Sequence, residues 1–301
     1  MKLIKTEHFG IARKIVSNMT SESWEAVPHA GFTYEADVSG FLDVIKEINQ
    51  GKTGVDKISV NTAMLRVIVE GIKACPIMNS HIHFNRKLVR GRLETFENID
   101  ISMPVTFENG EMMTLNMHDM GNKTMTEINA AIHDTMRRAK NTNMDEVMYE
   151  VSLDNTLTAL KHGKIGQTVC RLIGSKTGKH KVKNLSGRAK KEYYAIPETE
   201  RLTKHDIEQG TITVSNLGSL WRDWHGDCAL LEIIPPQIVA MAISAAQKTP
   251  MVDENDNIYI GRKMTLTLIF DHRAVDMGLL IPFVKKIDEV FKSPEIIKEW
   301  I

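Results

Sequence analysis

Residues 264–276 read MTLTLIFDHRAVD and join a strand pattern to a helix pattern. Apolar side chains alternate with threonines between Met264 and Phe270, which predicts a β-strand. After Asp276, apolar residues recur at helical spacing as far as Phe291, which predicts a closing helix. His272 follows the strand, where loops expose side chains, and imidazole is well matched to moving a proton near neutral pH. The four-residue spacing from His to Asp is weak evidence by itself, so a structural role for His272 is the alternative.

A second polar strand end lies at residues 213–218, which read TVSNLG. The pattern predicts a strand over 211–215 that ends at Ser215 and Asn216, just before Gly218. A hydroxyl at such a position can donate a hydrogen bond to a developing oxyanion. Ser215 lacks the Gly-x-Ser-x-Gly elbow, which argues against a nucleophilic serine. The alternative is that Ser215 and Asn216 have ordinary turn roles.

The rest of the chain alternates irregularly between helical and strand patterns. Helices are predicted within 12–19, 38–51, 59–75 and 125–136, and strands at 32–36, 81–84, 87–89, 99–103, 112–115 and 238–243. Turns at Asn85-Arg86 and Glu108-Asn109-Gly110 would close two hairpins. This order favours an α/β (α+β) protein with a mixed sheet covered by helices on one face.

The composition is that of a globular protein. The 301 residues are 42% hydrophobic and include 38 basic and 38 acidic side chains. Zero net charge argues against nucleic acid as the main partner. No apolar run approaches the roughly 20 residues of a membrane helix, and the three scattered cysteines form no disulfide or zinc pattern. We therefore expect a cytoplasmic protein with no metal, no nucleic acid and no membrane partner.

Residues 141–200 differ in character from the rest. Within them, residues 171–191 hold eight basic side chains and no acidic one, and Gly174, Gly178 and Gly187 are expected to interrupt any helix. We predict an insertion with a mobile basic loop inside a single catalytic domain that spans 1–301. The loop is either a solvated surface or an electrostatic site for a phosphorylated cofactor or an acidic partner.

The two strand-end motifs resemble the catalytic domain of the dihydrolipoyl acyltransferases of 2-oxo acid dehydrogenase complexes. Residues 271–276 are similar to the family's DHRxxDG motif, and residues 213–218 to its TISNLG segment. Weaker similarities lie at 13–16, 28–29, 76–79 and 235–240. Their order and spacing agree with the family from about residue 9 to 140 and from about 200 to the end.

The resemblance implies a chloramphenicol acetyltransferase-like fold in a homotrimer or a larger trimer-based assembly. It implies acyl transfer between coenzyme A, as acyl-CoA, and a thiol acceptor. His272 would be the general base and Ser215 the oxyanion donor, with His272 from one subunit and Ser215 from its neighbour. No lipoyl domain precedes the core, so we expect a separate lipoyl-domain protein to present the dihydrolipoyl group.

The resemblance also implies supporting residues. Asp276 is expected to pair with Arg13 and to hold the active-site loop, while Asn216 and Arg273 support the two motifs. A partly buried carboxylate at Asp276 needs such a partner, and an arginine fork is the best geometric match.

The chain departs from the family pattern in three places. Met277 stands where the family has Gly, residues 112–116 replace its Gly-Leu-x-x-Pro segment, and residues 141–200 have no family counterpart. Two alternatives therefore stay open. One is an O- or N-acyltransferase on a small molecule, as in chloramphenicol acetyltransferase, and the other is a non-catalytic assembly core of the same fold.

Overall fold

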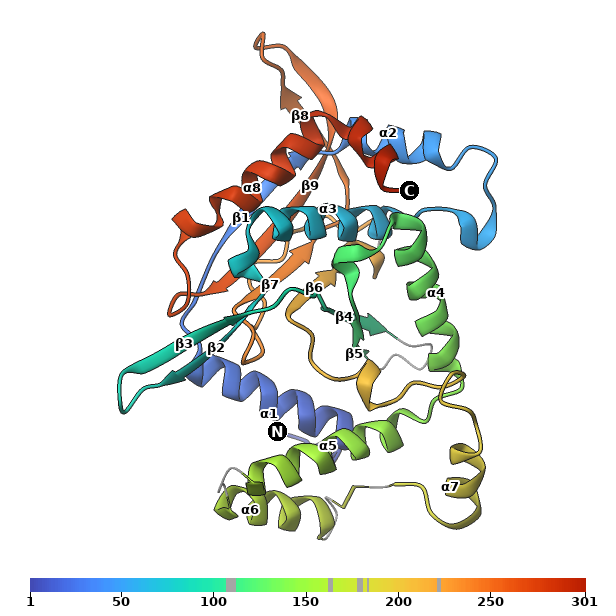
Figure 1. Cartoon of the computed structure of the whole chain (residues 1–301), viewed down its shortest axis with the longest axis vertical. Helices are drawn as coiled ribbons and strands as arrows, with labels where there is room; N and C mark the ends of the chain where they lie inside the picture. The colour runs from blue at the N-terminus through green and yellow to red at the C-terminus, as the bar shows by residue number, and fades with distance from the viewer. Residues whose placement is uncertain (107–111, 162–164, 178–180, 183, 221–222) are drawn as a thin grey trace. The chain divides into compact units, whose positions relative to one another are not determined.

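The computed structural model describes residues 1–106, 112–161, 165–177, 181–182, 184–220 and 223–301 (Figure 1). They form two compact units. The helical unit consists of Met1–Ser21 and Asp134–Glu208, and the sheet unit consists of Glu22–His133 and Gln209–Ile301. Both strand-end motifs belong to the sheet unit. No helix in the described part of the chain is long and apolar enough to cross a membrane.

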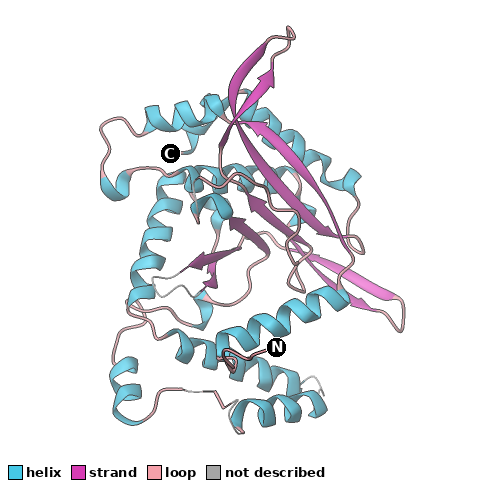
Figure 2. Ribbon diagram, turned by 180° about the vertical axis from the view of Figure 1, so that it is seen from behind, coloured by secondary structure: helices cyan, strands magenta, loops and turns pink. Residues whose placement is uncertain are grey.

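A mixed seven-stranded sheet organises the sheet unit (Figure 2). The strand order is β1-β9-β7-β6-β4-β5, and β8 pairs with β9. Neighbours β4 and β6, and β6 and β7, are parallel, whereas the other pairs are antiparallel. The predicted mixed sheet is therefore confirmed. The strands are β1 (His29–Asp37), β4 (Ile101–Thr106), β5 (Met112–Met117), β6 (Ile212–Asn216), β7 (Val239–Ile243), β8 (Gln247–Val252) and β9 (Ile258–Asp271).

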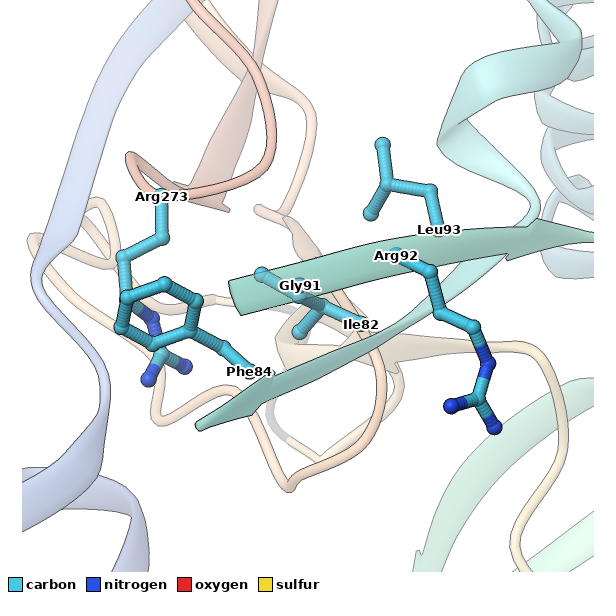
Figure 3. Close-up of a pocket in the computed structure, with 6 residues that line it drawn as sticks. All are labelled: Ile82, Phe84, Gly91, Arg92, Leu93 and Arg273. Atoms are coloured by element: carbon cyan, nitrogen blue, oxygen red, sulfur yellow. The ribbon is translucent and has the colours of Figure 1, made fainter. Parts of the chain in front are cut away.

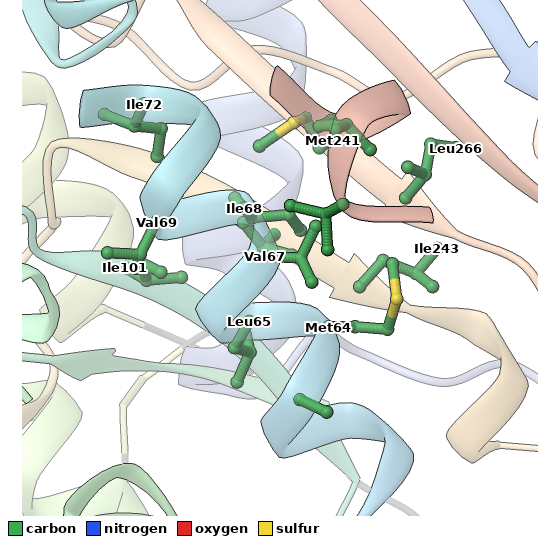
Figure 4. Close-up of a cluster of buried hydrophobic side chains, with 14 of the residues drawn as sticks. Met64, Leu65, Val67, Ile68, Val69, Ile72, Ile101, Met241, Ile243 and Leu266 are labelled. Carbon is green, nitrogen blue, oxygen red and sulfur yellow. The ribbon is translucent and has the colours of Figure 1, made fainter. Parts of the chain in front are cut away.

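Helices α2 (Ser39–Ile48), α3 (Val60–Ala74) and α8 (Met277–Lys292) share one hydrophobic core with the sheet. Figure 4 shows Met64 and Ile68 of α3 among side chains of β7 and β9. Helix α3 begins after Ser59, whose hydroxyl accepts a hydrogen bond from the Thr62 amide. Gly71 lets α3 approach α8, because a Cβ atom there would lie 2.6 Å from the ring of Phe283.

A separate hairpin joins β2 (Ser80–Asn85) to β3 (Arg90–Thr95). The predicted hairpin is confirmed, but its turn is longer than predicted and includes 87–89, which were expected to be a strand. The reason is the Asn85 side chain, whose oxygen accepts hydrogen bonds from the amides of Lys87 and Leu88. Strands β4 and β5 also form the predicted hairpin, although its turn at 108–110 lies outside the described residues.

Helices dominate the helical unit. They are α5 (Met144–Lys161), α6 (Ile165–Lys176) and α7 (Gly187–Tyr194). The prediction of a loop over 171–191 is therefore wrong at both of its ends. Helix α6 continues through Gly174, since one internal glycine costs only about 1 kcal/mol. The carboxylate of Glu146 is fully buried and accepts hydrogen bonds from the Leu185 amide and the Tyr194 hydroxyl, which fixes the α7 segment to α5.

Two further helices, α1 (Ile11–Ala26) and α4 (Met125–Lys140), each contain residues assigned to both units. Helix α1 is longer than the predicted 12–19, and α4 confirms the predicted helix at 125–136. The altered family segment at 112–116 lies within β5 and pairs regularly with β4. Met277 begins α8 without a positive φ angle, so its backbone does not require glycine.

Candidate active site

The loop after β9 is folded by its first residue, Asp271. This side chain is fully buried, and the backbone oxygen of Asp271 accepts hydrogen bonds from the amides of Ala274 (2.9 Å) and Val275 (3.2 Å). The carboxylate accepts further hydrogen bonds from Arg273, which donates from its backbone amide (2.9 Å), from Nε (3.0 Å) and from Nη2 (2.6 Å). A buried carboxylate needs such partners, and the planar arginine fork supplies them. The turn therefore closes around Asp271 and leaves His272 on the outside.

The imidazole of His272 is accessible to solvent. Its side chain is 55% exposed, and its Nδ1 atom lies 3.2 Å from Oδ1 of Asp276. Its backbone amide donates to the carbonyl of Pro28 (3.1 Å), which anchors the loop to the residue before β1. The contact with Asp276 favours the tautomer that carries its proton on Nδ1, so Nε2 can accept a proton. Among the described residues, none is hydrogen-bonded to Nε2 of His272.

Two neighbouring histidines are occupied by structural contacts. Nε2 of His29 accepts a hydrogen bond from the Ile233 amide (3.1 Å), so it cannot accept a substrate proton without losing that bond. His81 contacts the Gly210 carbonyl (3.4 Å), and burial lowers the pKa of its imidazole. These environments leave His272 as the candidate base.

Asp276 is placed differently from the expectation. Its side chain is 76% exposed and contacts His272, whereas partial burial and a partner in Arg13 were expected. Arg13 lies on α1 in the helical unit, and its pairing with Asp276 stays a prediction. Asp276 also precedes α8 as its N-cap residue, and its side chain makes no capping hydrogen bond there. The carboxylate is therefore available to orient the imidazole.

Ser215 lies near the end of β6 and is partly buried. No hydrogen bond to its hydroxyl is found within the described part of the chain. The next residue, Asn216, ends the strand. Its Nδ2 donates to Oδ1 of Asn61 on α3 (2.6 Å), and its own Oδ1 accepts from the Ser219 amide (3.1 Å). The supporting role of Asn216 stays a prediction. Its partner Asn61 lies 155 residues away in sequence and was not among the predicted site residues.

Sheet register separates Ser215 from His272 within one chain. Ser215 pairs with Ala242 of β7, and Ala242 pairs with Thr267 of β9. Four residues at about 3.3 Å each separate Thr267 from Asp271, so they are about 13 Å apart along β9. Two strand spacings add about 10 Å across the sheet, which gives about 16 Å between Ser215 and Asp271. His272 and Ser215 of one chain therefore lie at opposite ends of the sheet.

Comparison with known proteins agrees with this architecture. The family model described as 2-oxoacid dehydrogenases acyltransferase (catalytic domain) matches residues 4–166 and 179–298. Residues 167–178 are the internal stretch left unmatched, so the prediction that all of 141–200 lacks a family counterpart is wrong.

Curated relatives include the dihydrolipoyllysine-residue acetyltransferase component of the pyruvate dehydrogenase complex from Rickettsia prowazekii. It is 25% identical over 285 residues, which are 94% of this chain and 52% of the relative. The corresponding protein of Rickettsia felis is 24% identical over 287 residues, again 94% of this chain and 52% of the relative. The chain thus spans about half the length of these relatives.

Solved structures show the same fold. A probable dihydrolipoamide acetyltransferase from Listeria monocytogenes has a TM-score of 0.65 at 17% identity, and the match covers 96% of this chain and 94% of that one. The cubic core of a pyruvate dehydrogenase multienzyme complex has a TM-score of 0.67 at 15% identity, covering 98% and 94%. With both motifs on the matching fold and the family model covering most of its length, the chain belongs to the 2-oxoacid dehydrogenase acyltransferase family as a catalytic domain.

Proposed function

We propose that this chain transfers an acyl group between coenzyme A and a thiol acceptor, the acceptor being a dihydrolipoyl group presented by another chain. The contact between His272 and Asp276 at the end of β9 carries this proposal, because it prepares an accessible imidazole to accept a proton. The curated relatives named as dihydrolipoyllysine-residue acetyltransferases support the choice of reaction.

Each residue has a defined step. As the acceptor sulfur attacks the thioester carbon, its proton passes to Nε2 of His272. The carbonyl oxygen becomes an oxyanion, to which the Ser215 hydroxyl donates. When the intermediate collapses, the bond from carbon to the coenzyme A sulfur breaks, and that sulfur takes the proton from His272. Asp276, whose Oδ1 lies 3.2 Å from Nδ1, stabilises the imidazolium form by its negative charge.

The register argues that two chains share each site. A base and an oxyanion donor must both lie within a few ångströms of one thioester, whereas Ser215 and Asp271 of one chain are about 16 Å apart. We therefore propose a homotrimer in which His272 of one subunit meets Ser215 of its neighbour. Arg273 supports the loop through Asp271, and Asn216 supports the end of β6.

The experiment measures acetyl transfer from acetyl-CoA to free dihydrolipoamide. His272→Ala should abolish transfer, because it removes the imidazole that takes the thiol proton. His133→Ala, which removes an exposed imidazole on α4, is the matched control and should retain activity. Equal activity of the two variants would contradict the role of His272. Transfer only to alcohols or amines would favour the small-molecule acyltransferase, and absence of both transfer and coenzyme A binding would favour the assembly core.

Two further properties follow from the same proposal. The three cysteines are free thiols in the structure, which supports a reducing cytoplasmic location. The family model matches the chain on both sides of residues 167–178, which supports one catalytic domain with a short insertion at these residues. Expression with and without a fluorescent tag, followed by fractionation, tests the first. Replacement of 167–178 by a short Gly-Ser linker tests the second, since the rest of the chain should still fold.

A further inference from the structure

The loop that carries His272 also borders a cavity of about 350 Å³ (Figure 3). Ligand pockets usually measure about 300 to 1,000 Å³, so a small group fits this one. Strands β2 and β3 supply most of the lining, and the loop after β9 supplies Arg273 (Figure 3). The lining residues are Ile82, Phe84, Gly91, Arg92, Leu93 and Arg273.

One part of the lining is apolar, and its Phe84 ring contacts both β3 and Arg273. The Phe84 ring lies against the backbone of β3, since a Cβ atom at Gly91 would be 3.0 Å from Cδ2 of Phe84. On another side, the guanidinium carbon of Arg273 is 5.9 Å from the centre of the Phe84 ring. With Ile82 and Leu93, this ring offers an apolar surface to a short methylene chain.

The other part consists of unused hydrogen-bond donors. Arg273 uses Nε and Nη2 to bind Asp271, which fixes its guanidinium group but leaves Nη1 without a partner among the described residues. Arg92 uses Nε to bind Glu94 (2.7 Å), and neither of its terminal nitrogens has a partner within the same described ranges. The lining has two guanidinium groups, and each is ion-paired along one edge with a carboxylate that lies outside the lining. Guanidinium forks match carboxylate and phosphate oxygens.

We propose that this cavity is a subsite for an oxyanion, a carboxylate or a phosphate, that the acyl-CoA substrate carries next to an apolar segment. The inference rests on the proposed function, which supplies acyl-CoA as the substrate, and Arg273 directly follows His272 in the chain. Two sources have this chemistry: a carboxylate at the far end of the acyl group, and the 3′-phosphate of coenzyme A. The side chain of Arg92 is 67% exposed, so we expect effects of about fivefold, as for other solvated ion pairs.

Binding of thioesters without any acceptor tests the subsite independently of catalysis. Calorimetry compares succinyl-CoA with butyryl-CoA, which has the same number of acyl carbons and no carboxylate, and acetyl-CoA with its 3′-dephospho form. For each pair, the affinity ratio is the affinity of the thioester with the extra charged group divided by that of the thioester without it. Arg92→Gln should lower this ratio about fivefold in one of the two pairs. Glu94→Gln should increase the same ratio, because it releases Nε of Arg92. Arg86→Gln, which removes a charge from the hairpin turn outside the lining, is the control and should change neither ratio.

The outcomes separate the two proposals. If Arg92→Gln lowers the affinity ratio of succinyl-CoA to butyryl-CoA, the subsite binds a carboxylate of the acyl group. If it lowers the affinity ratio of acetyl-CoA to its 3′-dephospho form, the subsite binds the 3′-phosphate. If Arg92→Gln leaves both ratios as in the wild type, the subsite is refuted even if acetyl transfer occurs. If acetyl transfer never occurs but a ratio changes, the catalytic proposal fails and the subsite stands.

Discussion

Two inactive variants should restore each other's activity if each site is formed by two chains. Within one chain, sheet register holds Ser215 and Asp271 about 16 Å apart, and the side chains are too short to close that distance. His272→Ala and Ser215→Ala should therefore be inactive or severely slowed alone. In a ring of three chains that contains both variants, an intact His272 meets an intact Ser215 at one of the three interfaces. We therefore expect about one third of wild-type activity per site in assemblies that contain both variants.

The assay co-refolds the two variants with different tags and isolates assemblies that carry both tags. Acetyl transfer to dihydrolipoamide is then measured per chain. Each variant refolded alone, and the two variants mixed after refolding, are the controls and should show little activity. If doubly tagged assemblies are as inactive as the single variants, the site is not shared. An active monomer in light scattering would refute the same reasoning by another route.

The remaining predictions concern stability. Arg13→Met and Asp276→Asn should combine less than additively in urea unfolding if the two side chains pair, with a coupling of about 0.5–3 kcal/mol; strict additivity would refute the pairing. Gly71→Ala should lower the melting temperature, because a Cβ atom there would lie 2.6 Å from a ring on α8, and overpacking costs about 1–3 kcal/mol; an unchanged melting temperature would show that the helices can separate freely. Asp206 is buried, which opposes its ionisation, but hydrogen bonds led by that from Arg138 outweigh burial and lower its pKa below the ordinary 3.8. Its contribution to stability is therefore complete above pH 3.8 and is lost as the pH falls through the lower folded-state pKa, so Asp206→Asn should destabilise the protein at pH 7 and the difference should shrink in acid.

The C-terminal half of β9 was predictable from the alternation of threonines with apolar residues. Both faces of this half are buried, the threonines included, so the alternation does not mark a face that is exposed to solvent. The turn after β2 was not predictable from propensity, since one side chain, Asn85, decides how the next residues fold. Likewise, Gly174 lies within α6 although glycine disfavours helices.

The candidate site was predictable from its two motifs, but the contacts within it were not. His272 and Ser215 are strand-end residues, and strand ends are recognisable in sequence. The contact of His272 with Asp276 forms only because the turn closes around Asp271, which spacing alone does not reveal. Asn61 reaches Asn216 from a helix early in the chain, and a single sequence contains no signal for that contact.

The position of β1 at the edge of the sheet has a consequence for biosynthesis. Within the described residues, β1 pairs only with β9, and β9 ends at Asp271, far from β1 in the sequence. A ribosome that adds about 5–20 residues per second needs roughly ten to fifty seconds to reach Asp271 after completing β1. Throughout this interval, β1 has no sheet to join, and its apolar face stays uncovered on the nascent chain. Pairing of β1 therefore waits for the synthesis of β9, and chaperones that bind extended apolar segments have their longest opportunity at β1.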